Sequence, residues 1–270
     1  MLLQIRHETV YEYLNPVSYS IQTLKLTPRA DPGQRILSWR LYTPGERLEQ
    51  VDPFGNVTHL VTVEIPHRTM RIVVEGVAEI EPPREGLLEA EGGLSPLAFL
   101  APTALTRPSP RIVEFAERHL GRHPPGAGAL MDLAEGIRAA VTYEPGITDV
   151  THSAIAALEL GAGVCQDQAH VLVACCRSLR IPARYVSGYF HTGDAGEIAS
   201  HAWADVWIDS QRGWLSIDVT HGVVAGERHC RLAVGRDYLD AAPVRGLRRG
   251  GGEETMKVTV QLSTGQGQQQ

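Results

Sequence analysis

Cysteine is scarce in this sequence of 270 residues, which contains only four, at positions 165, 175, 176 and 230. Two of them are adjacent, and so few cysteines in a chain of this size do not form the disulfide framework of a secreted protein. The cysteine content therefore predicts free thiols and a reducing compartment.

Long apolar runs are also absent. The N-terminal stretch MLLQIRHETVYEYL carries charge at Arg6 and Glu8, too early for the apolar core of a signal peptide. No segment of the sequence reaches the length of a membrane span. Together these absences predict a cytoplasmic protein without a membrane partner.

Positive charge is not in excess, because 25 Lys and Arg residues stand against 31 Asp and Glu residues, a formal net charge of −6. The one dense basic patch, Arg245 to Arg249, lies in a glycine-rich stretch that is typical of a solvated connector. The charge balance argues against a nucleic-acid partner. A hydrophobic content of 43% with 21% charged residues is that of a globular protein, long enough for two domains.

Residues 1–80 show the two-residue periodicity of β-strands. Apolar and polar residues alternate from Val57 to Ile65, and Arg35 to Tyr42 and Met70 to Ile80 add further strand patterns. The segment Asp52 to Asn56 has turn chemistry. We expect a small all-β, sandwich-like domain.

Prolines at 82, 83, 96, 102 and 108 indicate that residues 81–108 form a linker or a segment wrapped on the surface. Ser109 has the chemistry of a helix cap before Pro110 to Leu120, and a second helical pattern covers roughly Leu130 to Val141. Residues 109–262 are predicted to form an α+β domain that ends in a short strand, Met256 to Gln261. The glycine- and glutamine-rich residues 263–270 are predicted to be disordered.

The segment GAGVCQDQAHVLVACCRSLRIPAR, from Gly161 to Arg184, places a cysteine where a helix begins. Apolar residues recur at helical spacing from Cys165 to Leu179, glycines precede the run, and Pro182 marks its end. Unpaired amides and the positive end of the helix dipole stabilise a thiolate and a developing oxyanion there. Cys165 is therefore a candidate nucleophile.

Two strand patterns follow, separated by the four residues 209–212. If they form a hairpin with that loop, Ile208 lies opposite Gly213, and His201 lies opposite Thr220. Asp218 is then the diagonal neighbour of His201 on the same face, with backbone positions roughly 7–8 Å apart. A slip of one residue would separate the two side chains, so this contact depends on the length of the loop.

A thiolate nucleophile, a histidine base and an orienting carboxylate form a unit for acyl transfer. In this scheme His201 takes the proton of the Cys165 thiol and later gives one to the leaving amine, while Asp218 orients the imidazole. The amide of Cys165 would donate to the oxyanion, and the sequence does not identify the second donor.

Several short segments of this sequence resemble motifs of the transglutaminase-like superfamily, specifically its bacterial members with an extra N-terminal β domain. They are GVCQDQAH, IPARYVSGY, SHAW, GWLSIDVT and, near the C-terminus, VGRDYLDAAPVRG. The resemblance implies a papain-like core of helices packed on an antiparallel sheet, and it carries over Cys165, His201 and Asp218 as the catalytic triad. Val219 departs from the family's pattern, which usually has proline after the aspartate. No acidic cluster of the calcium-site type is present, so neither calcium dependence nor any other cofactor is carried over.

The resemblance leaves the reaction open. A thioacyl group on Cys165 can be captured by water, which hydrolyses a peptide or isopeptide amide, or by a small amine, which gives transglutamination. We favour hydrolysis of a peptide or protein substrate, because nothing in the sequence marks an amine site.

Three other classes of function remain as alternatives. Acyl transfer of the arylamine N-acetyltransferase kind would need a coenzyme A pocket that the sequence does not show. A non-catalytic peptide-binding protein could retain the fold. A metal site is disfavoured, because Cys165 and His170 stand about 140° apart on a helix, as do His170 and Cys175, and His229 with Cys230 lack a partner pair.

Overall fold

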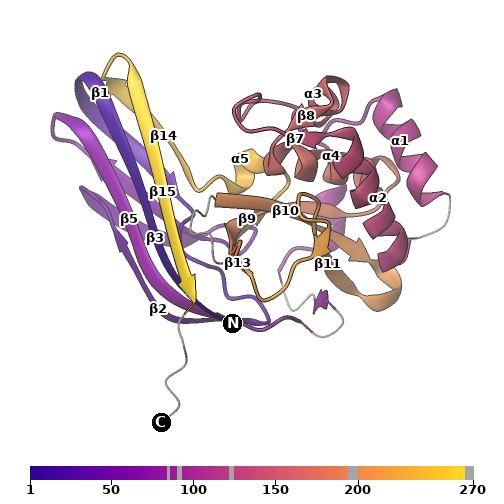
Figure 1. Ribbon diagram of the computed structural model, residues 1–270. Helices are drawn as coiled ribbons and strands as arrows, with labels where there is room; N and C mark the ends of the chain where they lie inside the picture. Colours follow the sequence, from indigo (N-terminus) through magenta and orange to yellow (C-terminus); the bar gives the residue numbers. More distant parts are fainter. Residues whose placement is uncertain (84–85, 90–92, 122–124, 194–199, 265–270) are drawn as a thin grey trace, which may run out of the picture.

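The computed structural model describes residues 1–83, 86–89, 93–121, 125–193 and 200–264, and it contains two units built on two antiparallel sheets (Figure 1). The first sheet has the strand order β2-β5-β1-β4-β3, with β14 and β15 also paired to β1. The second has the order β12-β11-β10-β9-β13, with β6 also paired to β11. This mixed architecture confirms the predicted α+β class with an all-β N-terminal region.

The first sheet is organised around β1 (Leu2–Leu24), whose buried residues alternate with more exposed ones along most of its length. This strand lies between β4 (Val57–Val63) and β5 (His67–Ile80), while β3 (Glu46–Val51) pairs with β4 and β2 (Gln34–Tyr42) pairs with β5. The N-terminal half of β1 pairs with β5 and its C-terminal half pairs with β4. The register shifts between Glu12 and Val17, around Pro16, which has no backbone N–H to donate.

The C-terminal part of the chain returns to this first sheet. β14 (Val244–Gly250) pairs with the C-terminal half of β1, and β15 (Glu254–Thr264) pairs with its N-terminal half, so each of them lies beside β1 (Figure 1). The segment 250–252, three glycines with φ of 88°, 93° and 66°, joins them. Side chains other than glycine rarely adopt this left-handed conformation.

This pairing corrects two expectations. Residues 244–262 belong to the sheet of the N-terminal unit and not to the second unit, and the basic patch Arg245 to Arg249 is a strand and not a connector. The predicted strand Met256 to Gln261 is present but longer, and it includes residues 263 and 264 of the predicted tail. Residues 265–270 lie outside the described residues.

The second unit combines four helices with the second sheet. They are α1 (Pro110–Leu120), α2 (Ala127–Ala140), α3 (Ala154–Leu160) and α4 (Cys165–Ser178). The sheet contains β6 (Leu87–Glu89), β9 (Ala183–Phe190), β10 (Ser200–Ile208), β11 (Gly213–Asp218), β12 (Val223–Val224) and β13 (His229–Gly235). Short elements complete the unit: the 3₁₀ turns η2 (Pro96–Leu100) and η3 (Asp209–Gln211), the parallel pair β7 (Thr142–Tyr143) and β8 (Ala162–Gly163), and α5 (Tyr238–Ala241).

Helix α1 begins as predicted, because the Ser109 side chain accepts a hydrogen bond from the amide of Ile112 at 3.3 Å. Helix α2 starts three residues before the predicted Leu130. The sequence pattern did not indicate α3, which is only seven residues long.

Helix α4 is the centre of the second unit, and every residue from Gln166 to Arg177 is buried. It packs against α1, α2 and α3 and against β9 and β10. Several of its polar side chains find partners inside the protein, as when the side-chain amide of Gln168 donates to the carbonyl of Val141 at 2.8 Å. Arg177 donates to the carbonyls of Phe99 and Ala183, each at 2.8 Å.

The segment predicted as linker or wrapping chain contributes to the second unit. β6 pairs with β11, and the buried Phe99 packs edge-on against Trp214 with ring centroids 5.5 Å apart. Within this segment Phe99 is buried, whereas Leu97 is 68% exposed.

A buried network joins the two units. The Arg231 guanidinium lies 2.6 Å from the carboxylate of Asp205 and 3.2 Å from that of Asp31, which belongs to the N-terminal unit. Nearby, His7 of β1 and the Tyr189 hydroxyl of β9 are hydrogen-bonded at 2.8 Å. Among the described helices, none is both long and apolar enough to cross a membrane.

Candidate active site

Cys165 is the first residue of α4, as the sequence predicts. The residue before it, Val164, provides no side-chain cap, so amides of the first helical turn remain available to a ligand. The Asp167 carboxylate accepts hydrogen bonds from the Val164 amide at 2.8 Å and from the Thr148 hydroxyl at 2.7 Å. These contacts fix the start of the helix and hence the position of the thiol.

Cys165 also differs from the other three cysteines in exposure. Its side chain is partly exposed, whereas Cys175, Cys176 and Cys230 are buried. Burial raises the pKa of Cys176 and of Cys230 to about 12 and that of Cys175 well above its ordinary value. Cys165 is therefore the accessible thiol of the chain.

The hairpin of β10 and β11 has the predicted register, since Ile208 pairs with Gly213. This register brings the Nε2 atom of His201 to 2.8 Å from the Oδ2 atom of Asp218. Because Nε2 is engaged by the carboxylate, Nδ1 is the nitrogen left for Cys165.

The protonation of His201 follows from these contacts. Burial lowers the pKa of His201, but hydrogen bonds to Asp218 and to Cys165 outweigh burial and raise the pKa to about 9. For Asp218 the effects are opposite in sign. Burial alone would raise the pKa of its carboxyl group, but the hydrogen bonds from three histidines bring this pKa well below its usual range. The carboxylate is therefore ionised and accepts hydrogen bonds.

Two histidines that the sequence reasoning did not assign to the site also reach Asp218. His221 Nδ1 lies 2.7 Å and His229 Nε2 lies 3.0 Å from the same Oδ2 atom. The amide of His221 donates to Oδ1 at 3.2 Å. The spacing of three residues between Asp218 and His221 could have indicated from the sequence that these two side chains meet. No such local pattern exists for His229, which reaches the site because β13 lies next to β9 in the sheet.

Ligand atoms of His201, Asp218 and His221 lie within 4.8 Å of one another, the kind of cluster that could hold a metal ion. However, both imidazole nitrogens lie at hydrogen-bond distance from one carboxylate oxygen, at 2.7 and 2.8 Å. Zinc ligands instead surround an ion at about 2.0–2.2 Å, so a metal would have to replace both shared protons and separate these atoms. The geometry fits a hydrogen-bonded cluster better than a metal centre.

Several aromatic residues near the strands of the site belong to the core. Tyr185, Tyr189, Trp203 and Trp214 are buried. Tyr143, which the sequence reasoning did not consider, is half exposed and pairs in register with Gly163, two residues before Cys165. Burial and the nearby charge of Cys165 raise the pKa of Tyr143.

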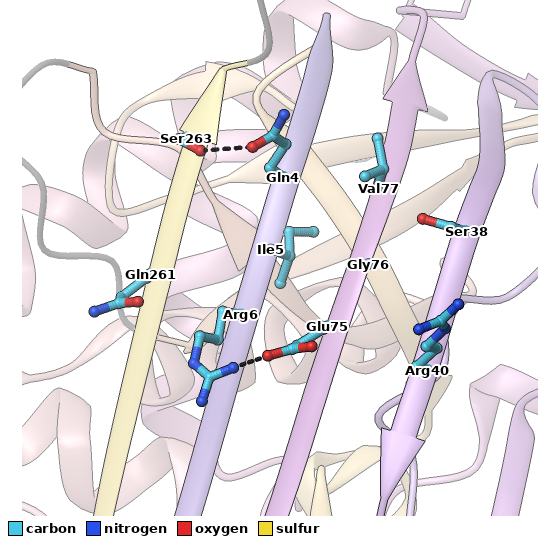
Figure 2. Close-up of a pocket in the computed structure, with 10 residues that line it drawn as sticks. All are labelled: Gln4, Ile5, Arg6, Ser38, Arg40, Glu75, Gly76, Val77, Gln261 and Ser263. Carbon is cyan, nitrogen blue, oxygen red and sulfur yellow. Dashed lines mark hydrogen bonds and ion pairs between the residues drawn. The ribbon is translucent and has the colours of Figure 1, made fainter.

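A hollow elsewhere is not part of this site. An open depression of about 600 Å³ lies on the first sheet. Figure 2 shows its lining, which consists mainly of polar residues of β1, β2, β5 and β15, with Ile5 and Val77 among them. An ion pair between Arg6 and Glu75 crosses it. None of the three predicted catalytic residues lines this depression.

Comparison with known proteins agrees with the architecture. An uncharacterized protein of Mycobacterium leprae (strain TN) is 33% identical over 279 residues, which span 97% of this chain and 98% of the relative. An uncharacterized protein of Mycobacterium tuberculosis (strain H37Rv) is 32% identical over 90% of this chain and 86% of its own length. The model of the transglutaminase-like superfamily matches residues 114–219.

The chain belongs to the transglutaminase-like superfamily. The match to the superfamily core contains Cys165, His201 and Asp218, and the model of the bacterial transglutaminase-like N-terminal region matches residues 3–79. A crystal structure of a proposed cysteine protease from Cytophaga hutchinsonii has the same fold, with a TM-score of 0.79 and 23% identity over 97% of this chain and 90% of that one. The likeness to that structure thus extends over both units.

Proposed function

We propose that this protein catalyses acyl transfer from an amide through a thioester on Cys165, with hydrolysis of a peptide or isopeptide amide as the reaction. The observation that carries the proposal is the 2.8 Å contact between His201 Nε2 and Asp218 Oδ2, which leaves Nδ1 of His201 for the thiol at the start of α4.

In the acylation step, His201 Nδ1 holds the proton of the Cys165 thiol, and the thiolate attacks the carbonyl carbon of the amide. The C–N bond then breaks, and His201 transfers the proton to the leaving amine. The Cys165 amide and the dipole of α4 stabilise the oxyanion that forms between these events.

In the deacylation step, a water molecule gives a proton to His201 and attacks the thioester carbon. The C–S bond breaks, the carboxylic acid leaves, and the thiolate of Cys165 pairs again with the imidazolium of His201. Water is favoured as the acceptor because Cys165 is partly exposed and the side chain of His221, a partner of Asp218, is 36% exposed.

The test is release of ammonia or amine from a library of peptides and isopeptides, measured with and without an added primary amine. Cys165→Ala is expected to abolish release, and Cys176→Ala, which removes a buried thiol from the same helix, is expected to retain it. Release that persists in Cys165→Ala would refute the proposal. Incorporation of the added amine in place of water would instead identify the reaction as transglutamination.

A further inference from the structure

The carboxylate of Asp218 is the point at which three imidazole rings meet. Its Oδ2 atom lies 2.8 Å from His201, 2.7 Å from His221 and 3.0 Å from His229, and the side chain of Asp218 is fully buried. We infer that His229 is a positioning residue, which holds this carboxylate against His201 so that Nδ1 of His201 stays directed at Cys165. The catalytic consequence of this inference rests on the proposed function, but the geometry does not.

The neighbours of His229 determine which of its nitrogens carries the proton. The amide of Gly226 donates to Nδ1 at 3.1 Å, so Nδ1 must be unprotonated. Nε2 therefore carries the proton and donates it to the ionised Asp218. Burial, the largest effect, lowers the pKa of His229. The ring is thus a neutral donor with one tautomer at neutral pH.

The surroundings of His229 keep this donor in place. The residue begins β13 and pairs in register with Phe190 of β9. Its ring lies 4.7 Å from that of Phe190 and 5.2 Å from that of Trp203, measured between centroids. The His229 side chain is only 4% exposed, whereas that of His221 is 36% exposed. Water can replace the contact of His221 with Asp218, but it has little access to that of His229.

Loss of the His229 donor has a specific consequence for the triad. A buried carboxylate that loses a partner turns toward its remaining donors, and Asp218 has two of these in His221, the ring and the amide. Movement toward His221 weakens the contact with His201. The imidazolium of His201 then loses its hydrogen bond to Asp218, which is the largest of the effects that raise the pKa of His201. The ion pair between Cys165 and His201 forms less readily as a result.

A pair of amide substitutions tests this role. In His229→Gln the amide nitrogen reaches the place of Nε2 and keeps a donor for Asp218, whereas in His229→Asn the same group is too short. The rate of alkylation of Cys165 by iodoacetamide is followed by mass spectrometry at pH 6 and pH 9. In His229→Asn we expect the ratio of the pH 6 rate to the pH 9 rate to fall about tenfold or more, and in His229→Gln to stay within about threefold of the wild type.

His7→Asn is the matched control, because it replaces another buried neutral histidine that contacts Tyr189 and Thr9 but no residue of the triad. It is expected to leave the alkylation ratio unchanged. If a substrate is found, His229→Asn should lower kcat at least about tenfold with little change in KM. The alkylation assay needs no substrate, so it separates failure of this inference from failure of the proposed function.

Unchanged alkylation ratios in both His229 variants would overturn the inference, and so would equal losses in both, since the retained donor of Gln would then be irrelevant. Nitrogen-15 NMR of the histidines in the wild-type protein provides a test that needs no folded variant. We expect His229 to be neutral and protonated on Nε2 at pH 7, and a ring protonated on Nδ1 or on both nitrogens would be equally decisive against it.

Discussion

At the scale of single residues, the site depends on differences between groups of the same kind. Among the four thiols, only Cys165 combines partial exposure with a helix start, and among the histidines that the structure describes, only His201 combines a carboxylate partner with a thiol partner. Environment, not residue type, therefore distinguishes the candidate catalytic groups.

The thiols provide the first prediction at this scale. Iodoacetamide at near-neutral pH should label Cys165 well before Cys175, Cys176 and Cys230, because burial excludes the reagent from these three and raises their pKa. Peptide mapping by mass spectrometry measures the order. Equal labelling of all four cysteines in the folded protein would contradict it.

A second prediction concerns the pH dependence of stability. The pKa of His201 is about 9 in the folded protein, above the ordinary value of 6.5. The protonated imidazole therefore stabilises the fold fully below pH 6.5, and this contribution is lost as the pH rises through about 9. Asp218→Asn should weaken this dependence, which urea unfolding at pH 6, 7.5 and 9 would measure.

The same Asp218→Asn variant should lower kcat by a factor on the order of 10³ to 10⁴, because the neutral amide no longer selects the tautomer of His201. His7→Asn, which removes side-chain contacts to Tyr189 and Thr9 but none to the triad, serves as control for both measurements. A stability curve for Asp218→Asn that still falls between pH 6.5 and 9 as in the wild type would show that another group causes the dependence.

At the scale of elements, local patterns predicted those parts of the site that depend on short-range geometry. The start of α4 at Cys165 followed from glycines and helical spacing, and the contact of His201 with Asp218 followed from the length of the loop 209–212. Both depend on residues close in sequence, and this is why they could be predicted without knowledge of the whole fold.

Other elements depend on distant partners and could not be predicted in this way. His229 reaches Asp218 because β13 lies next to β9, and nothing local to the sequence specifies that order. Helix α4 contains Gln168 and Arg177, which suggest solvent exposure, yet both are buried because distant carbonyls accept their hydrogen bonds. The partner of β14 and β15 is β1, at the opposite end of the chain.

The start of α4 provides a prediction at this scale. A Cβ atom at Gly163 would lie 2.7 Å from Asp167 Oδ2, the atom that accepts from Val164 and Thr148. Gly163→Ala should therefore displace that carboxylate, destabilise the fold by about 1–3 kcal/mol and slow alkylation of Cys165.

Gly128→Ala is the control for this substitution, because it lies inside α2 and no atom stands within 4 Å of the added Cβ. It should stabilise the fold by roughly 0.5–1 kcal/mol through helix propensity. Urea unfolding measures both variants, and a Gly163→Ala protein as stable as the wild type would show that Asp167 can move without cost.

At the scale of the whole molecule, the two units are not independent segments of the chain. The first and last strands share one sheet, and the second unit lies between them in sequence (Figure 1). Arg231 of β13 contacts both Asp205 in the second sheet and Asp31 in the N-terminal unit. The candidate site thus lies in the second unit, and the chain passes from the first sheet into this unit and then back to the first sheet.

This closed arrangement predicts the effect of shortening the chain. A protein that ends at Pro243 lacks β14 and β15, so the backbone of β1 loses its partners along one edge from Leu3 to Leu24, and the buried Val260 is removed from the core. An unpaired edge of this length destabilises a sheet and promotes aggregation. We expect a lower melting temperature and a lower soluble yield than for a protein that ends at Thr264, which retains both strands. If the two proteins had equal melting temperatures by circular dichroism, the C-terminal strands would be dispensable and the first sheet would fold on residues 1–80 alone.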